Sequence, residues 1–311
     1  MRRVWAAAFL GGLAALLPGP AAAAAPAARV GLFVETGPAA NEEVAAGLRD
    51  ALRNAVADGR TVEVLERATP ADESEMRAAL AELAIEGVEV VAAVGDTAAR
   101  IAPESIRDRS VVAVSADGAA PAGGRVHGVA MTPDPARAAE ELLRVAPGAR
   151  RIAVVGPLAG SADALVVALQ SKGPGGPAVV RVMWSETGGF RSPGIGGADV
   201  VLASPDTPTA EVTDLARALS GQGAALVGSR ADHLDAGAAI VLRPALRDVG
   251  ALAAAACVDA LAGNSAAPRT RRPRRLLREV HLPNARRLGF PVPLTVLASS
   301  DRTVVPPPER K

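Results

Sequence analysis

The feature that most constrains the fold is a regular alternation of short apolar runs with amphipathic segments, beginning at RVGLFVE (29–35). The apolar runs are rich in Val and Ala and predict buried strands, whereas the segments between them have helical spacing. In the helix expected over 41–57, for example, apolar residues recur every four positions from Val44. Strands that alternate with helices form parallel, doubly wound sheets, so the pattern predicts an α/β fold. The expected order is strand 29–35, helix 41–57, strand 61–67, helix 73–86, strand 88–94, a helix from 97, strand 110–116 and helix 133–147.

The same order starts again at Arg150, which predicts a second Rossmann-like lobe. The expected elements are strand 150–156, helix 161–171, strands 178–184 and 198–204, helix 210–219, strand 224–229, and a short strand with a long helix within 239–263. After these come a basic linker, one strand, a short helix and a tail. We expect residues 29–127 and 239–278 in the first lobe, and residues 128–238 and 279–311 in the second, with three chain crossings as a hinge.

The N-terminus has the plan of a cleavable signal peptide over residues 1–25. A basic start precedes the apolar run Val4–Leu17 and a stretch of small residues. The apolar run is shorter than the ~20 residues that span a bilayer. Cys257 is the only cysteine of the chain, so neither a disulfide nor a lipid anchor near the leader is expected. These features predict a soluble periplasmic protein that is not embedded in a membrane, and we expect a monomer.

Composition excludes several classes of function. Hydrophobic residues make up 49% of the chain and charged residues 22%, which is typical of a protein with a packed core. The net charge of +1 argues against a nucleic-acid binder. The arginine run within 269–278 is interpreted as a solvated hinge segment, with a surface for anionic partners as the alternative.

One strand end points to a binding edge. The strand expected over 88–94 stops at Gly95, Asp96 and Thr97 and then continues as a helix. The carboxyl edge of a parallel sheet is where ligands bind in open α/β folds, and a helix start there offers free backbone N–H groups. The alternative is that Asp96 or Thr97 only caps its own helix.

Four stretches resemble the substrate-binding proteins of ABC transporters of the tryptophan/tyrosine-binding type. They are VVAAVGDTAARIA, VVAVSADGAAPAGGRVHGVAMTPD, GADVVLASPDTPTAEV, and GSRADHLDAGAAIVLRPALRDVGALAAAACVDALAGN with EVHLPNARRLGFPVP after it. The resemblance implies a type I periplasmic-binding-protein fold with a ligand cleft between the lobes. The sequence departs from the family's pattern at Gly156 and Pro157, where an Asn or Tyr is common. It also has no tyrosine and few aromatic residues for stacking on a ring; Trp184, Phe190 and Phe33 are the candidates.

The resemblance implies ligand contacts from loops at strand ends in both lobes. In the implied cleft, Thr97 and Ser161 are placed to hold a carboxylate, and Asp206 or Asp117 to take an ammonium group. For each of these residues taken alone, helix capping or turn formation is the competing interpretation. The candidate ligand-binding residues are Glu35, Thr36, Gly95, Asp96, Thr97, Ser115, Asp117, Gly156, Ser161, Asp206, Ser229 and Asp232.

The implied function is that of the solute-binding component of an ABC-type importer. It would bind an amino-acid-like or other small molecule and deliver it to an inner-membrane permease. The alternative is an accessory or sensor protein whose degenerate cleft serves a protein partner. No enzyme signature is present in the sequence, and the three histidines lack metal-ligand spacing, so we expect no catalytic residues, metal or cofactor.

Overall fold

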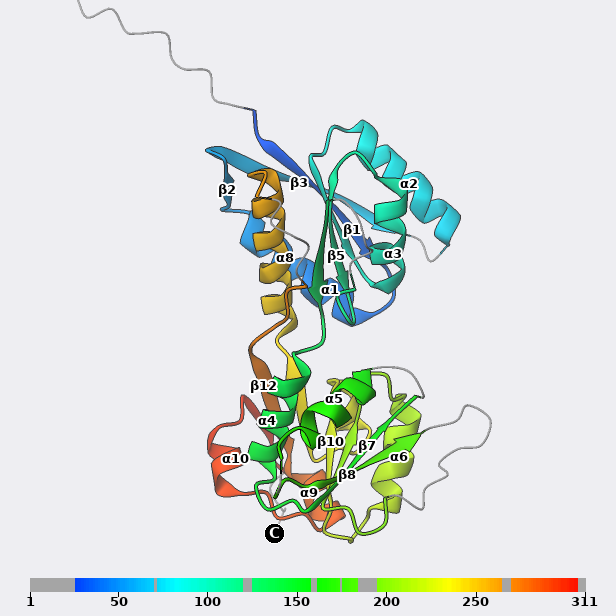
Figure 1. Ribbon diagram of the computed structural model, residues 1–311, viewed down its shortest axis with the longest axis vertical. Helices are drawn as coiled ribbons and strands as arrows, with labels where there is room; N and C mark the ends of the chain where they lie inside the picture. Colours follow the sequence, from blue (N-terminus) through cyan, green and yellow to red (C-terminus); the bar gives the residue numbers. More distant parts are fainter. Residues whose placement is uncertain are drawn as a thin grey trace, which may run out of the picture.

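Two β-sheets organise the computed structural model, which describes residues 26–69, 72–119, 125–157, 161–173, 175–183, 195–264 and 270–306. Within this part of the chain, the first sheet has the strand order β2-β3-β1-β4-β5-β6 and the second β13-β12-β11-β10-β9-β7-β8. Each sheet forms the centre of a separate lobe, and the two lobes lie one above the other (Figure 1). The prediction of an α/β fold with two doubly wound lobes is confirmed. The predicted leader, residues 1–25, lies outside the described residues.

The first lobe contains the N-terminal elements and one helix that returns late in the sequence. Its elements are β1 (Ala28–Glu35), α1 (Ala39–Leu52), β2 (Val56–Ala57), β3 (Arg60–Thr69), α2 (Glu73–Ile85), β4 (Val90–Val94), α3 (Asp96–Ser105), β5 (Ser110–Ser115), β6 (Val126–Ala130) and α8 (Leu246–Leu261). Successive residues of its central strands point alternately to the two faces of the sheet, and each face packs against its own hydrophobic cluster. Val90, Ala92 and Val94 pack towards α1 and α8, whereas Val91 and Ala93 pack towards α2 and α3.

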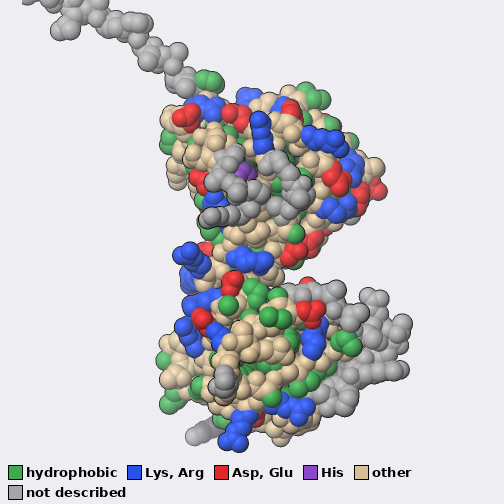
Figure 2. Space-filling model, viewed as in Figure 1, with side chains coloured by type: hydrophobic (Ala, Val, Ile, Leu, Met, Phe, Trp, Pro, Cys, Tyr) green, Lys and Arg blue, Asp and Glu red, His purple; other side chains and the backbone are tan. Residues whose placement is uncertain are grey.

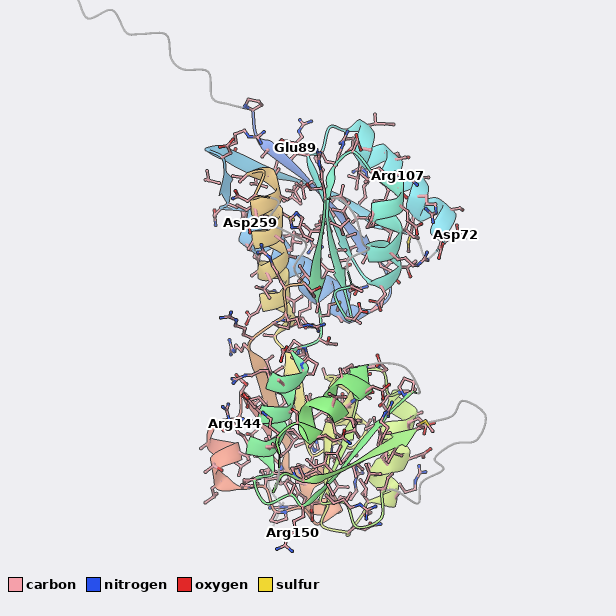
Figure 3. The ribbon with its side chains drawn as sticks, in the orientation of Figure 1. Asp72, Glu89, Arg107, Arg144, Arg150 and Asp259 are labelled. Atoms are coloured by element: carbon pink, nitrogen blue, oxygen red, sulfur yellow. The ribbon has the colours of Figure 1, made fainter. Side chains whose placement is uncertain are left out.

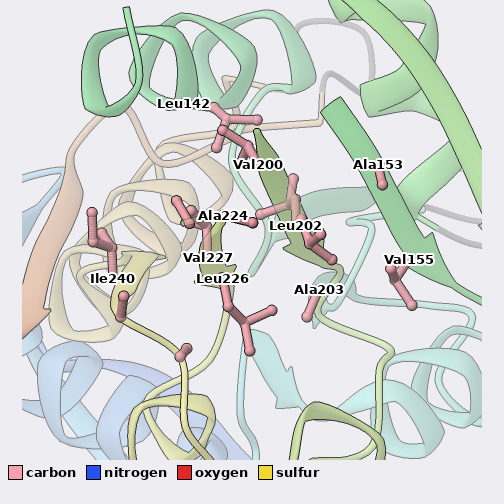
Figure 4. Close-up of a cluster of buried hydrophobic side chains, with 14 of the residues drawn as sticks. Leu142, Ala153, Val155, Val200, Leu202, Ala203, Ala224, Leu226, Val227 and Ile240 are labelled. Atoms are coloured by element: carbon pink, nitrogen blue, oxygen red, sulfur yellow. The ribbon is translucent and has the colours of Figure 1, made fainter. Parts of the chain in front are cut away.

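The second lobe is built around a core of small apolar strand residues. Its elements are α4 (Pro135–Val145), β7 (Arg151–Gly156), α5 (Ser161–Gln170), β8 (Ala178–Met183), β9 (Val200–Ala203), α6 (Thr209–Ala218), β10 (Ala225–Gly228), α7 (Asp232–Asp235), β11 (Ile240–Pro244), β12 (Leu276–His281), α9 (Leu282–Leu288), α10 (Leu294–Ala298) and β13 (Arg302–Val304). Figure 4 shows Leu142 of α4 beside Val200 and Leu202 of β9 within this cluster.

The described elements place three chain crossings between the lobes, and all three differ from the predicted boundaries. Strand β6 of the first sheet extends to Ala130 instead of ending at residue 127, and β12 of the second sheet begins at Leu276 instead of after residue 278. The crossings join β6 to α4, β11 to α8, and α8 to β12 (Figure 1). Residues 239–245 were assigned to the first lobe, but β11 pairs in parallel with β10 of the second sheet, and β12 starts there at Leu276. The sheet pairing moves the crossing to Ala245, after which α8 packs on the first sheet. The apolar sequence of β11 continues smoothly into α8, which hid the change of lobe.

The two strands at the crossings are held together by a largely buried ion pair. Arg243 of β11 donates from Nε to Glu279 of β12 at 2.7 Å, and the two side chains are 17% and 5% exposed. Glu279 also lies 3.5 Å from a guanidinium nitrogen of Arg302 in β13. Arg243 and Glu279 are diagonal neighbours on the antiparallel strands β11 and β12, so the pair cross-links the strands that carry the chain to and from the first lobe.

Candidate functional site

The carboxyl ends of both sheets face each other. In the first lobe, β1, β4, β5 and β6 are parallel, and β6 runs directly into the crossing to α4. In the second lobe, β7, β9, β10 and β11 are parallel, and β11 runs into the crossing to α8. The ends of all these strands therefore point towards the other lobe. The space-filling view shows a notch between the lobes on the side away from the crossings (Figure 2).

Glu35 occupies the start of helix α3. Its carboxylate accepts hydrogen bonds from the backbone N–H of Thr97 at 2.9 Å, from that of Ala98 at 3.4 Å, and from the Thr97 hydroxyl at 3.2 Å. The positive end of a helix dipole stabilises such an anion. The groups of Thr97 that were predicted to hold a ligand anion are thus engaged by a carboxylate of the chain itself.

The same contact explains Gly95. This residue has φ of 115°, a region that side chains with a Cβ rarely adopt. A Cβ added there would lie 2.5 Å from both Cβ and Oε2 of Glu35, and 2.9 Å from Nδ2 of Asn41. Asn41 in turn donates to the Glu35 carbonyl at 3.0 Å. Gly95 is therefore required for the approach of Glu35, whether or not a ligand comes near.

The remaining predicted residues of the first lobe form turns at the same edge. Asp96 accepts from the Ala116 N–H at 2.7 Å, which joins the ends of β4 and β5. Ser115 and Asp117 contact each other at 3.2 Å, and Asp117 accepts from the Ala119 N–H at 2.8 Å. The exposed Thr36 donates to the Thr69 carbonyl at 2.5 Å. The structure brings these residues to one edge, where each already has a partner within the chain.

Phe33 does not lie at the cleft edge of the first lobe. It was a candidate for stacking on a ring near the first cleft edge, but its side chain is fully buried between the sheet and helices α2 and α3. Phe33 and Glu35 point to the same face of β1, but Phe33 lies inside the hydrophobic layer, one pleat before the strand end. The other two aromatic candidates, Trp184 and Phe190, lie outside the described residues.

A buried polar network connects three strand ends of the second lobe. His233 is fully buried, accepts at Nδ1 from the Ser229 N–H at 3.2 Å, and places Nε2 3.1 Å from the Thr207 carbonyl. This pattern fits a neutral ring with its proton on Nε2. Burial, assisted by the Arg230 charge, lowers the pKa of His233 to about 4. The Thr207 hydroxyl donates to the Val155 carbonyl at 3.1 Å and lies 3.2 Å from the Ser204 hydroxyl.

Asp232 lies in an ion pair next to this network. Arg230 donates to it from Nε at 3.0 Å, and Thr209 donates to its other oxygen at 2.7 Å. Burial opposes ionisation of Asp232, but the hydrogen bonds from Arg230 and Thr209 outweigh it and lower the pKa of the carboxyl. Ser229 donates to the Ala203 carbonyl at 2.7 Å. The exposed Asp206 lies on the neighbouring loop, between β9 and α6.

An arginine that the sequence analysis did not single out bonds to the carbonyl groups at the end of β7. Arg181 donates to the carbonyls of Gly156 at 3.1 Å and of Pro157, and to the Asp163 carboxylate at 2.8 Å. A Cβ on Gly156 would collide with the Ser204 side chain, so this glycine is needed for packing. Ser161 begins helix α5, as predicted. Arg181 lies in mid-strand, outside the four stretches that resemble known proteins, so only a three-dimensional structure could place it here.

Two further properties of the described residues bear on function. They contain no group of three or more His, Cys, Asp or Glu side chains arranged to hold a metal ion. No helix in the described part of the chain is both long and apolar enough to cross a membrane.

Comparisons with known proteins show the fold of this chain but assign it to no family. No family model matches the chain, and no curated protein matches it in sequence. Among solved structures, it is similar to the ligand-free, open structure of a substrate binding protein with adhesive properties from Clostridium difficile, with a TM-score of 0.70 and 17% identity over 89% of this chain and 99% of that one. It is also similar to an ABC domain in complex with L-Trp from Streptococcus pneumonia, with a TM-score of 0.61 and 14% identity over 90% and 100%.

The same architecture occurs in a protein of another class. The Lac repressor matches with a TM-score of 0.52 and 17% identity over 81% of this chain and 80% of that one. Identities at this level show the fold alone, which is shared by transport proteins and regulators. The chain therefore has the two-lobed fold of type I periplasmic binding proteins.

Proposed function

We propose that this protein is the solute-binding component of an ABC-type importer. It would bind an amino-acid-like or other small molecule between its lobes and deliver that molecule to an inner-membrane permease. The observation that carries the proposal is that the carboxyl ends of both sheets face each other across the notch. Small-molecule sites in α/β folds lie at such edges, and closure of hinged lobes around a ligand is a common motion. A periplasmic location after removal of residues 1–25 belongs to the same proposal.

A second candidate function has an observation in its favour. Among the described residues of the first-lobe edge, Glu35 takes the N–H groups at the start of α3 and Asp96 takes the Ala116 N–H. An edge whose described donors are engaged in this way suits an accessory or sensor protein that binds a protein partner instead of a small molecule. The two candidates differ in whether a small molecule alone stabilises the protein.

Thermal unfolding in the presence of amino acids, purines and other small metabolites separates the candidates. A ligand at a hundred times its Kd stabilises the folded state by about 2.7 kcal/mol, which raises Tm by several degrees. Transport predicts at least one such ligand. If no compound at millimolar concentration moves Tm, the importer proposal is wrong and the accessory role stands.

A matched pair of variants locates the bound molecule. Thr36→Trp places a bulky ring at the first-lobe edge, and Thr213→Trp places the same ring on the exposed surface of α6. Each native threonine makes one hydrogen bond to a backbone carbonyl, so the two changes cost similar stability. A ligand between the lobes should lose at least tenfold in affinity in Thr36→Trp and remain unchanged in Thr213→Trp.

A further inference from the structure

A cavity of about 1130 Å³ lies beside the hinge, and none of the candidate ligand-binding residues is among its described lining residues. Its lining comes from β6 and α8 of the first lobe, from the start of α4, and from the crossing segment 270–274. Leu252 and Asp259 of α8 both line it, and they are about 10 Å apart along the helix axis. Figure 3 shows Asp259 on α8. The cavity is therefore large enough for a small organic molecule.

The lining carries more positive than negative charge. Arg137, Arg271, Arg272 and Arg274 face two aspartates there. Both aspartates have partners: Asp134 accepts from the N–H groups at the start of α4, and Asp259 pairs with Arg271. Figure 2 shows blue side chains gathered at the waist between the lobes.

Arg274 is the arginine of this set that remains available. It is exposed and makes no hydrogen bond or ion pair with any described residue. Within the described part of the chain, Arg272 donates one hydrogen bond to the Asp117 carbonyl at 3.1 Å and one to the Thr132 hydroxyl at 3.5 Å. Arginine binds phosphate and carboxylate groups through paired N–H donors. The arginine run of the sequence thus supplies donors to a defined cavity.

His127 provides an independent observation. His127 lines the cavity and is 8% exposed. Its buried Nε2 atom has no hydrogen-bond partner in the described part of the chain. Buried polar atoms without a partner are rare and costly in native proteins. Burial, together with the charge of Arg271, lowers the pKa of His127, which favours the neutral ring.

We infer that this hinge cavity is a second binding site, which takes a small multivalent anion bearing phosphoryl or carboxylate groups. Arg272 and Arg274 hold the anionic groups. Nε2 of His127 is covered in this structure, so it donates to one of the anionic oxygens only after a small shift of the cavity wall. The site includes α4 of the second lobe and α8 of the first, so an occupant bridges both lobes. The inference does not depend on solute binding at the strand ends.

Isothermal titration calorimetry with pyrophosphate and with citrate, at matched ionic strength, tests the site. At least one of the two should bind with a single saturable isotherm. Binding of pyrophosphate alone identifies a phosphorylated ligand, and binding of citrate alone a polycarboxylate. If neither anion binds up to millimolar concentration, the inference is wrong.

Neighbouring arginines provide the matched control. Arg274→Gln should weaken binding at least tenfold, because it removes a charged donor from the cavity. Arg275→Gln removes the same charge one residue later, where the side chain pairs with Asp301 and does not line the cavity. It should change affinity less than twofold. Equal weakening by both variants would show diffuse attraction to a basic surface and overturn the site.

A second variant tests the histidine. His127→Leu keeps an apolar side chain of similar bulk and removes the donor, and affinity should fall about tenfold. The melting temperature without anion should not fall, because the unpartnered nitrogen is lost. An unchanged affinity in a folded His127→Leu protein would remove His127 from the site, and together with an unchanged Arg274→Gln would overturn the inference.

Discussion

Glu35 and Gly95 depend on each other, although 60 positions separate them in the sequence. Glu35 supplies the anion that the start of α3 attracts, and Gly95 leaves the space in which that carboxylate lies. Thr97 therefore acts first as a donor to Glu35. At this position, helix capping and ligand binding compete for the same hydrogen-bond donors.

Replacing Gly95 tests this arrangement. We expect Gly95→Ala to lower the free energy of unfolding by about 2 kcal/mol or more, because it combines a strained φ with overlap on Glu35. Urea denaturation provides the measurement. Gly148→Ala is the control, since a Cβ there meets nothing within 4 Å. Equal stability of the two variants would contradict the packing explanation.

His233 makes stability depend on pH. Its pKa is about 4 in the folded protein, below the usual 6.5, so the unfolded chain binds more protons between these values. Stability should therefore fall as the pH drops from about 6.5 to 4, by on the order of 3 kcal/mol in total. Unfolding measured between pH 7 and pH 5 avoids most carboxylate titration. His233→Gln should be less stable at pH 7 but show a flatter dependence, and an NMR titration midpoint near 6.5 for His233 would refute the prediction.

At the scale of elements, the sequence predicts the types and the order of helices and strands well, but it predicts their boundaries poorly. Helix 41–57 was expected because apolar spacing continues to Val56, but α1 ends at Leu52 and β2 follows. Asp58 and Gly59 both have positive φ and turn the chain back into β3, a geometry typical of an Asp-Gly hairpin. That dipeptide was a readable signal. Strands β6 and β13 were missed; both lie at sheet edges, where pairing with one neighbour defines them.

For the candidate site, the sequence could predict the position at a strand end but not the hydrogen-bond partners. Local sequence places Gly95, Asp96 and Thr97 at a strand end, and the structure confirms that position. The partners of these residues come from Glu35 and Ala116, which no local spacing connects to them. Tertiary contacts between distant strand ends decide whether a donor is free.

Helices α1 and α8 pack through glycines. A Cβ on Gly250 would overlap the Val44 carbonyl, and one on Gly47 would overlap the backbone of Arg247. Alanine normally stabilises a helix by about 1 kcal/mol relative to glycine. We expect the reverse here: Gly250→Ala should lose about 2 kcal/mol or more of unfolding free energy, measured by chemical denaturation. Ala255→Gly, on the exposed face of α8, should lose only the ~1 kcal/mol of propensity, and a stabilised Gly250→Ala would disprove the close contact.

At the scale of the whole molecule, the lobes are connected through strands that share a buried charge pair. Glu279→Gln removes the close carboxylate partner of Arg243 and leaves it only the more distant Glu43 at 4.0 Å, so it should lower stability by about 3 kcal/mol. Glu66→Gln removes the exposed partner of Arg49 and should cost less than about 1 kcal/mol. Thermal and urea unfolding of both variants provide the comparison. Similar losses would mean that the crossing strands do not depend on this pair.

The late return of α8 also determines when each lobe can be completed during synthesis. Arg247 bonds to Asp50, 197 positions earlier, and α8 covers the face of the first sheet that presents Val30, Leu32 and Val34. Until the ribosome has made residue 261, that face has no cover from this helix, whereas β7 to β11 of the second lobe already exist. Contacts between such distant segments slow folding. The N-terminal lobe, although made first, is therefore finished after most of the lobe that follows it.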